Sequence, residues 1–202
     1  MEIVLATGNK NKLREFREML EADDVSIISQ SEFKNCPEVI EDGKTFEENA
    51  LIKAHAIAQH TGRITIADDS GLEVDYLNGA PGIYSARFAG TDADDDKNNQ
   101  KLLKELAGLP LEERGAQFTC VIAVVSPLGE ERTVRGEYRG CIIGSYRGQA
   151  GFGYDPIFLD KVSGLTYSEM SAQQKNSISH RARAIMELKK ILPEFLKEVH
   201  LG

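Results

Sequence analysis

Short apolar runs and stretches of helical periodicity alternate along much of this chain. Residues 3–6 form an apolar run that predicts a buried strand. Apolar residues then recur at helical spacing over 13–20 and again over 102–106, so a helix is expected at each place. The sequence Thr-Phe-Glu-Glu at 45–48 fits a capping box, and the apolar face behind it predicts a further helix.

The remaining pattern predicts strands and a final helix. Residues 64–67 and 72–74 read as two short strands, and 118–125 and 131–143 read as the strands of a hairpin. A helix is expected over about 179–199. Helices thus dominate the first half and a hairpin the second, which predicts an α/β protein with a mixed sheet and two lobes.

Composition and charge narrow the class of protein. Of 202 residues, 41% are hydrophobic and 28% are charged, which is ordinary for a globular protein. We take residues 1–202 as a single domain of two closely joined lobes. The formal net charge of -8 argues against binding a nucleic-acid polymer over a broad surface. A small anion can still be bound by a few local lysines or by a metal.

Cysteine usage and hydropathy suggest a cytoplasmic protein. Cys36, Cys120 and Cys141 lie far apart, so neither a disulfide framework nor a zinc site is indicated. We expect them to be buried, reduced thiols. No stretch approaches the ~18 apolar residues of a membrane span, and the N-terminus does not resemble a signal peptide. No association with a membrane is therefore expected.

Two adjacent carboxylates follow the strand predicted over 64–67. Asp68 and Asp69 come directly after this β-branched run and precede Ser70 and Gly71. Paired acids at the end of a strand suit a hard cation such as Mg²⁺. Asp, Ser and Gly are also ordinary turn residues, so a simple turn is the alternative.

A segment between the first strand and its helix suits a phosphate. In the sequence Thr-Gly-Asn-Lys-Asn-Lys at 7–12, Gly8 lets a phosphate approach the backbone and Lys12 adds a positive charge. The start of the following helix offers free N–H groups. The segment lacks the spacing of a Walker A loop, and a βα turn with solvated lysines is the alternative.

A third acidic position precedes the capped helix. Glu41 lies in the sequence Glu-Val-Ile-Glu-Asp-Gly at 38–43 and could supply a second metal ligand from another part of the chain. The alternative is an acidic surface loop.

Two later segments carry side chains suited to a purine base. Residues 151–156 alternate aromatics with glycines, and Phe152 can offer a surface on which a base stacks. A tight turn with aromatics in the core is the alternative. The start of the C-terminal helix concentrates the donors Lys175, His180 and Arg181. A helix start repels cations, so this cluster needs an anion or acceptor nearby unless it is a solvated basic turn.

Taken together, these segments resemble the inosine-triphosphate pyrophosphatase family, also called the non-standard purine NTP pyrophosphatases. The matching segments occur in the family's order over nearly the whole chain, and their combination is highly specific. They are Thr7-Gly8-Asn9 with Lys12 and Glu15, Thr45-Phe46 with Glu48-Asn49-Ala50, Ala67-Asp68-Asp69-Ser70-Gly71-Leu72, Gly79-Ala80-Pro81-Gly82-Ile83-Tyr84-Ser85-Ala86-Arg87, Gly151-Phe152-Gly153-Tyr154-Asp155-Pro156, and Ser179-His180-Arg181.

The resemblance implies a fold and an activity. The fold would be α/β, with an elongated mixed β-sheet flanked by helices and two lobes with an active-site cleft between them. The protein would be a homodimer. It would use Mg²⁺ to hydrolyse ITP, dITP and XTP to the nucleoside monophosphate and pyrophosphate, and so remove deaminated purines from the nucleotide pool.

The resemblance also implies roles for particular residues. Asp69 would accept the proton from the attacking water and, with Glu41, hold the metal. The sequence alone leaves open whether Asp68 or Asp69 accepts the proton. The residues implied to bind substrate are Thr7, Gly8, Asn9, Lys10, Asn11, Lys12, Ser70, Phe152, Gly153, Tyr154, Asp155, Lys175, His180 and Arg181.

Base selection follows from hydrogen bonding. Hypoxanthine and xanthine present an acceptor at C6, whereas adenine presents an amino donor there. Lys175, protonated His180 and Arg181 can only donate, so adenine would leave a donor facing a donor.

Two other functions are alternatives to the enzyme. A nucleotide sensor without turnover would not need the acids, and a phosphotransferase is disfavoured by the missing Walker A loop.

Overall fold

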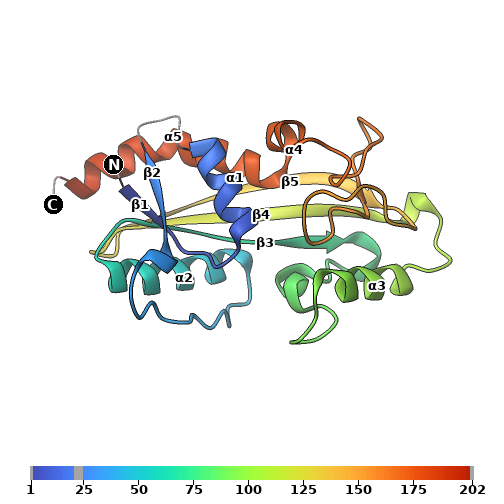
Figure 1. The fold of residues 1–202 in the computed structure, drawn as a ribbon, viewed down its shortest axis with the longest axis horizontal. Helices are drawn as coiled ribbons and strands as arrows, with labels where there is room; N and C mark the ends of the chain where they lie inside the picture. The colour runs from blue at the N-terminus through green and yellow to red at the C-terminus, as the bar shows by residue number, and fades with distance from the viewer. Residues whose placement is uncertain (1, 21–24, 201–202) are drawn as a thin grey trace. The chain divides into compact units, whose positions relative to one another are not determined.

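Within residues 2–20 and 25–200, which the computed structural model describes, the strands form one six-stranded sheet of order β2-β1-β3-β4-β5-β6 (Figure 1). They are β1 (Glu2–Leu5), β2 (Ser26–Ser29), β3 (Thr65–Val74), β4 (Gly115–Val125), β5 (Glu131–Ile142) and β6 (Phe158–Leu159). β1 pairs in parallel with β2 and β3, whereas β5 and β6 pair antiparallel. The predicted α/β fold with a mixed sheet flanked by helices is thus confirmed.

Most helices lie where apolar spacing predicts them. The α-helices are α1 (Lys10–Leu20), α2 (Phe46–Thr61), α3 (Asp95–Glu105), α4 (Ala172–Ile178) and α5 (His180–His200). Short 3₁₀ helices are η2 (Gln30–Glu32), η3 (Asp75–Leu77), η4 (Gly82–Arg87) and η5 (Leu111–Glu113).

Helix α4 was not predicted. Ser171 opens it with a capping box, and Ser179 ends it in extended backbone (ψ 160°) before α5 begins. Lys175 therefore lies in a separate short helix rather than at the start of the C-terminal helix. The Ser-Ala-Gln-Gln sequence at 171–174 was the overlooked signal.

Strand β3 is uninterrupted, so the strands predicted over 64–67 and 72–74 are parts of one strand. The acid pair at 68–69 lies inside it, which corrects both the strand-end and the turn interpretations. The strand that ends here is the neighbour β1, whose last paired residue, Leu5, lies opposite Ile66. The acids therefore follow the carboxyl end of β1, the position at which α/β sheets commonly bind ligands.

The capping box predicted for α2 forms only in part. The Thr45 side chain accepts from the backbone N–H of Glu48 at 3.1 Å, as predicted. The Glu48 carboxylate accepts from the N–H of Lys44, one residue before the cap, at 2.5 Å. Either arrangement satisfies N–H groups that a helix start leaves open.

The chain divides into two compact units. Unit 1 comprises Met1–Asp69, Cys120–Gly136 and Arg181–Gly202, and unit 2 comprises Ser70–Thr119 and Glu137–His180. In the core of unit 1, Ile3 and Leu5 of β1 cluster with Phe16 of α1 and Ile185 of α5. Figure 1 shows α1 and α5 on one side of these strands and α2 on the other. The cleft expected between two lobes stays a prediction.

Unit 2 has an aromatic core. The Phe118 ring lies 4.6 Å from the Phe158 ring and 5.7 Å from the Tyr167 ring, measured between centroids. Leu102 and Leu106 belong to the same cluster, so the apolar face of α3 is buried in this core.

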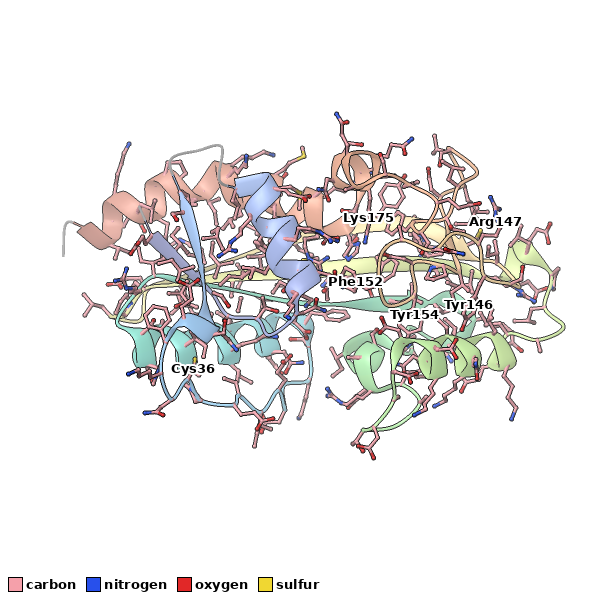
Figure 2. The ribbon with its side chains drawn as sticks, in the orientation of Figure 1. Cys36, Tyr146, Arg147, Phe152, Tyr154 and Lys175 are labelled. Atoms are coloured by element: carbon pink, nitrogen blue, oxygen red, sulfur yellow. The ribbon has the colours of Figure 1, made fainter. Side chains whose placement is uncertain are left out.

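Two of the three cysteines are buried as predicted. Cys120 and Cys141 are buried thiols, whereas Cys36 is only half-buried (Figure 2). The expectation that all three are buried is therefore wrong for Cys36, which lies in a loop after η2. Among the residues that the structure describes, no helix combines the length and apolar character needed to cross a membrane.

Candidate functional site

Asp68 accepts from two cations in unit 1. Its Oδ2 lies 2.9 Å from Nζ of Lys12 in α1 and 3.1 Å from Nη2 of Arg181 in α5. Arg181 also pairs with Glu15 of α1, with Nη1 and Oε2 2.5 Å apart. Asp68, Glu15 and Arg181 are buried, and the two carboxylates balance the two cations. Such compensation is what a buried ion cluster requires.

The Asp68 carboxylate stays ionised. Burial alone would raise the pKa of Asp68, but the charges of Lys12, Arg181 and Lys53 outweigh it and hold that pKa well below its usual range. A group that remains charged at every working pH is a poor proton acceptor. Asp68 is therefore suited to position Lys12 and Arg181.

Asp69 lies in different surroundings. Its Oδ2 accepts from Nδ2 of Asn49 in α2 at 3.0 Å, and Oδ1 of Asn49 accepts from the N–H of Gly43 at 2.8 Å. Burial raises the pKa of Asp69 above its usual value, against the lowering effects of Lys53, Asn49 and Lys12. A buried carboxylate with a raised pKa is a stronger base than an ordinary aspartate and is suited to accept a proton.

Lys53 connects the second predicted metal ligand to this carboxylate. Its Nζ lies 3.0 Å from Oε1 of Glu41. The same ammonium lowers the pKa of Asp69, whereas the charge of Glu41 raises it, so all three groups interact electrostatically. The charge of Glu41 thus acts on Asp69, and both the metal-ligand role and the acidic-loop alternative stay predictions.

Glu41 and Asp69 suit magnesium better than a metal that needs a full protein cage. Among residues 2–20 and 25–200, no group of three or more His, Cys, Asp or Glu side chains could hold a metal ion. Mg²⁺ is usually bound through one or two carboxylates, with waters and substrate phosphates supplying the other ligands. Two interacting carboxylates beside a compensating lysine fit that requirement.

In the segment predicted to hold phosphate, side chains accept hydrogen bonds from backbone N–H groups of the same segment. Oγ1 of Thr7 accepts from the N–H of Asn9 at 3.1 Å, and Oδ1 of Asn9 accepts from the N–H groups of Asn11 (2.9 Å) and Lys12 (3.3 Å). The prediction that this helix start offers free N–H groups is therefore wrong at Asn11 and Lys12, because Asn9 caps the helix. Gly8 and Lys10 are exposed, and Lys12 is paired with Asp68 rather than solvated.

In unit 2, Phe152, Asp155 and Lys175 form one cluster. Oδ2 of Asp155 accepts from the N–H of Phe152 at 3.0 Å and from Nζ of Lys175 at 2.7 Å. The Lys175 ammonium lies 4.7 Å from the centre of the Phe152 ring (Figure 2). The sequence therefore predicted a set of residues that the structure brings together, with a cation on an aromatic ring.

His180 and Arg181 are neighbours in sequence with different environments. The His180 ring stacks on Phe118, with centroids 4.6 Å apart and planes at 12°, inside the aromatic core of unit 2. Arg181 belongs to the ion cluster of unit 1. Burial lowers the pKa of Arg181, but the charges of Asp68 and Glu15 outweigh burial, so the net pKa lies above its ordinary value. The guanidinium is thus held by two carboxylates, which suits a positioning role, and its predicted contact with the base stays a prediction.

The other predicted substrate residues have varied surroundings. Ser70 is half-buried in β3. The Tyr154 hydroxyl is buried and donates to the carbonyl of Ser85 at 2.8 Å, so Tyr154 packs in unit 2 as a turn aromatic would. Gly153 has a left-handed backbone (φ 61°) that only glycine adopts readily.

Three residues of the site were not predicted to have a role: Lys53, Asn49 and Glu15. Asn49 and Lys53 are four residues apart in α2 and so share one helix face. That face is otherwise apolar, with Ala50, Ala54 and Ile57 buried. A polar pair on a buried face is a signal that sequence can give, although only the structure shows which carboxylates it meets.

Known proteins are similar to this chain in sequence and in fold. A model of the Ham1 family matches residues 3–191. The chain belongs to the Ham1 family. It is 49% identical to a dITP/XTP pyrophosphatase of Bacillus licheniformis over 96% of this chain and 98% of that protein. It is 51% identical to the Geobacter sulfurreducens protein of the same name over 93% and 94%.

Solved structures agree with this membership of the Ham1 family. A Ham1 protein from Coxiella burnetii superimposes with a TM-score of 0.87 at 42% identity, covering 96% of this chain and 99% of that one. The Staphylococcus aureus Ham1 protein gives a TM-score of 0.85 at 43% identity, with the same coverage.

Proposed function

We propose that this Ham1-family chain hydrolyses ITP, dITP and XTP to the nucleoside monophosphate and pyrophosphate in the presence of Mg²⁺. The proposal draws on the names of relatives that are 49% and 51% identical over nearly their whole length. It draws equally on the surroundings of Asp69.

The observation that carries the proposal is the buried carboxylate of Asp69. Burial raises the pKa of this carboxylate. In hydrolysis between the α- and β-phosphates, a water attacks the α-phosphorus and pyrophosphate leaves. Asp69 accepts the proton of that water, while Asn49 fixes the carboxylate through its 3.0 Å hydrogen bond. Asp68 is the weaker candidate, since Lys12 and Arg181 lower its pKa and so make it a weaker base.

Glu41 and Asp69 would hold Mg²⁺. When bound, the cation neutralises the negative charge of the triphosphate and of the pyrophosphate that leaves. Lys53 forms a 3.0 Å ion pair with Glu41, and its charge lowers the pKa of Asp69. Lys12, fixed by Asp68, supplies a cation for the triphosphate beside Gly8 and Lys10.

Recognition of the base is assigned to unit 2. Phe152 offers its ring as a stacking surface, with the Lys175 ammonium 4.7 Å from its centre. Lys175, which donates to Asp155, carries only N–H donors, and we assign one of them to the keto oxygen at C6. His180, when protonated, is the second donor. Adenine, with a donor at C6, is disfavoured by the same groups.

The proposed role is removal of deaminated purines from the nucleotide pool of the cytoplasm, by a homodimer. Acidic composition, with a net charge of -8, supports a small-molecule substrate rather than a nucleic-acid polymer.

The deciding experiment is product analysis with ITP. We expect equimolar IMP and pyrophosphate by ³¹P NMR, no orthophosphate, loss of turnover with EDTA and recovery on adding Mg²⁺. Orthophosphate with IDP would indicate a different phosphatase reaction. Tight ITP binding without products would favour a sensor.

A further inference from the structure

The loop that presents Phe152 is held by helix α3. The N–H of Gly153 donates to Oδ2 of Asp95 at 2.7 Å. The carbonyl of the same residue accepts from Nδ2 of Asn99 at 2.9 Å. Asp95 and Asn99 are four residues apart in α3 and therefore lie on one helix face, one turn apart. Both polar groups of Gly153 are thus clamped by a single helix.

We call the two hydrogen bonds to Gly153 the clamp and the ring of Phe152 the platform; the clamp lies one residue from the platform. Gly153 follows Phe152, whose own N–H is held by Asp155 at 3.0 Å. Its φ of 61° turns the chain sharply between Phe152 and Tyr154. A backbone held at two successive residues can hold the Phe152 ring in one orientation before a ligand arrives, and such preorganisation strengthens binding.

The orientation of the Asn99 amide is fixed by its partner. A carbonyl oxygen can only accept, so the nitrogen of Asn99 must face Gly153. Asn99 is 2% exposed, and its Oδ1 has no hydrogen-bond partner among the residues that the structure describes. An unsatisfied buried acceptor costs stability. An asparagine that serves folding alone would be expected to satisfy both ends of its amide.

Its neighbour Asn98 does satisfy both ends. Nδ2 of Asn98 donates to the carbonyl of Ala86 at 3.1 Å, and Oδ1 accepts from the N–H of Ala89 at 2.8 Å. Asn98 is equally buried, at 2% exposed, and it holds the chain at the end of η4 rather than the Phe152 loop. The two asparagines therefore form a matched pair, of which only Asn99 contacts the backbone next to Phe152.

Three successive aspartates at the start of α3, at positions 94–96, also differ in their hydrogen-bond partners. The Asp94 side chain caps the helix by accepting from the N–H of Lys97 at 2.8 Å. Asp96 accepts from the hydroxyl of Tyr146 at 2.7 Å (Figure 2). Asp95 is the member of this run that meets Gly153.

We propose that Asp95 and Asn99 are positioning residues that hold the Phe152 platform in place for the purine base. The inference rests on the proposed function, because it assigns a purpose to the loop only if Phe152 binds a base. It predicts that the two residues affect binding of every purine triphosphate alike, since stacking tolerates any base.

The test uses the full-length protein and the kinetics of ITP, XTP and ATP. Asp95→Ala removes an acceptor, and we expect KM to rise about threefold to tenfold for all three substrates, with kcat nearly unchanged. Asp95→Asn keeps an oxygen that can accept from Gly153, so it should restore most of the wild-type KM. Asp96→Asn, which changes the same charge in the same turn, should leave KM at its wild-type value.

Asn99→Ala and Asn98→Ala provide the second comparison. We expect Asn99→Ala to raise KM, whereas Asn98→Ala lowers Tm with little change in KM. Adding Asp95→Ala to Phe152→Ala should raise KM no further, because the first residue acts through the second. Hydrogen exchange at residues 152–154 should accelerate in Asp95→Ala but not in Asp96→Asn.

The outcomes separate the inference from the proposed function. A wild-type protein that releases no pyrophosphate from ITP overturns the proposed function, and the exchange rates still test the clamp. An active wild type with an unaltered KM in Asp95→Ala overturns the inference. Equal KM changes in Asp95→Ala and Asp95→Asn would also overturn it, by showing an effect of charge alone. Additive losses in the double variant would do the same.

Discussion

Asp68 and Asp69 are consecutive in β3, yet their carboxylates have opposite electrostatic environments. Successive side chains of a strand point to opposite faces. Asp68 meets Lys12 of α1 and Arg181 of α5, and Asp69 meets Asn49 of α2, which Figure 1 shows on the other side of the strands in unit 1. The pKa of Asp68 is lowered and that of Asp69 is raised. One strand thus carries one carboxylate with a lowered pKa and one with a raised pKa.

The first prediction follows from this separation. Asp69→Asn keeps the shape and can keep a hydrogen bond to Asn49, but it removes the charge and the basic oxygen. We expect kcat for ITP to fall by about 10²–10⁴-fold, the usual contribution of a general base. Calorimetric binding of ITP, measured with and without Mg²⁺, should show that the substrate still binds.

An Asp69→Asn variant that keeps kcat within tenfold of wild type would contradict this assignment. Circular dichroism and Tm should accompany the kinetics, because loss of folded protein would also lower kcat.

The second prediction concerns the metal. Glu41→Gln should raise the Mg²⁺ concentration for half-maximal activity more than it raises KM for ITP, because an amide oxygen carries no charge for a hard cation. Asp42→Asn is the matched control, since it changes one charge in the adjacent residue. Equal Mg²⁺ dependence in the two variants would return Glu41 to the acidic-loop interpretation.

The third prediction uses Lys53 and pH. Its ammonium lowers the pKa of Asp69, while burial raises it. Lys53→Met removes the lowering charge, so Asp69 should lose its proton only at higher pH. The acidic limb of the pH profile of kcat should therefore move to higher pH. Lys44→Met, at an exposed lysine before α2, should not move that limb.

Much of the fold was predictable because local signals agree with it. The helices α1, α2, α3 and α5 follow apolar residues at helical spacing, and β4 and β5 follow two long apolar or alternating runs. The failure at β3 has a physical cause. Asp68 and Asp69 are poor strand residues by propensity. Their polar partners come from distant parts of the chain, namely Lys12 and Arg181 for Asp68 and Asn49 for Asp69.

The candidate site residues could be named from the sequence, but the residues that they contact could not. Glu41, Asp69, Phe152 and Lys175 could be named from motifs. The ion pair between Arg181 and Glu15 joins residues 166 positions apart in the chain, so no local pattern can indicate it.

The fourth prediction compares two glutamates of α1. Glu15 is buried and pairs with Arg181, whereas Glu18 is exposed and lies 4.0 Å from Arg14. Glu15→Gln leaves a buried guanidinium short of a counter-charge and should lower the free energy of unfolding by about 3–5 kcal/mol. Glu18→Gln should change it by less than about 1 kcal/mol. Urea titrations of both variants make the comparison.

If both substitutions cost the same, the Arg181 cluster contributes no more to folding than a surface pair. The positioning role given to Arg181 would then lose its support.

The last prediction separates affinity from selectivity in unit 2. Phe152→Ala removes the stacking surface and should weaken ITP, XTP and ATP alike, by about 1–3 kcal/mol in kcat/KM. Lys175→Met removes the donor to the C6 oxygen but keeps most of the side chain, so the ratio of kcat/KM for ITP to that for ATP should fall. The ratio is the right measure, because Lys175→Met leaves the Asp155 carboxylate buried without its 2.7 Å ion pair and will cost folded protein. A loss of folded protein lowers both values equally and cancels. If the ratio is unchanged in Lys175→Met, that lysine serves only to hold Asp155 and the Phe152 backbone, and the discrimination between keto and amino purines has to come from another donor, for which His180 is the next to substitute.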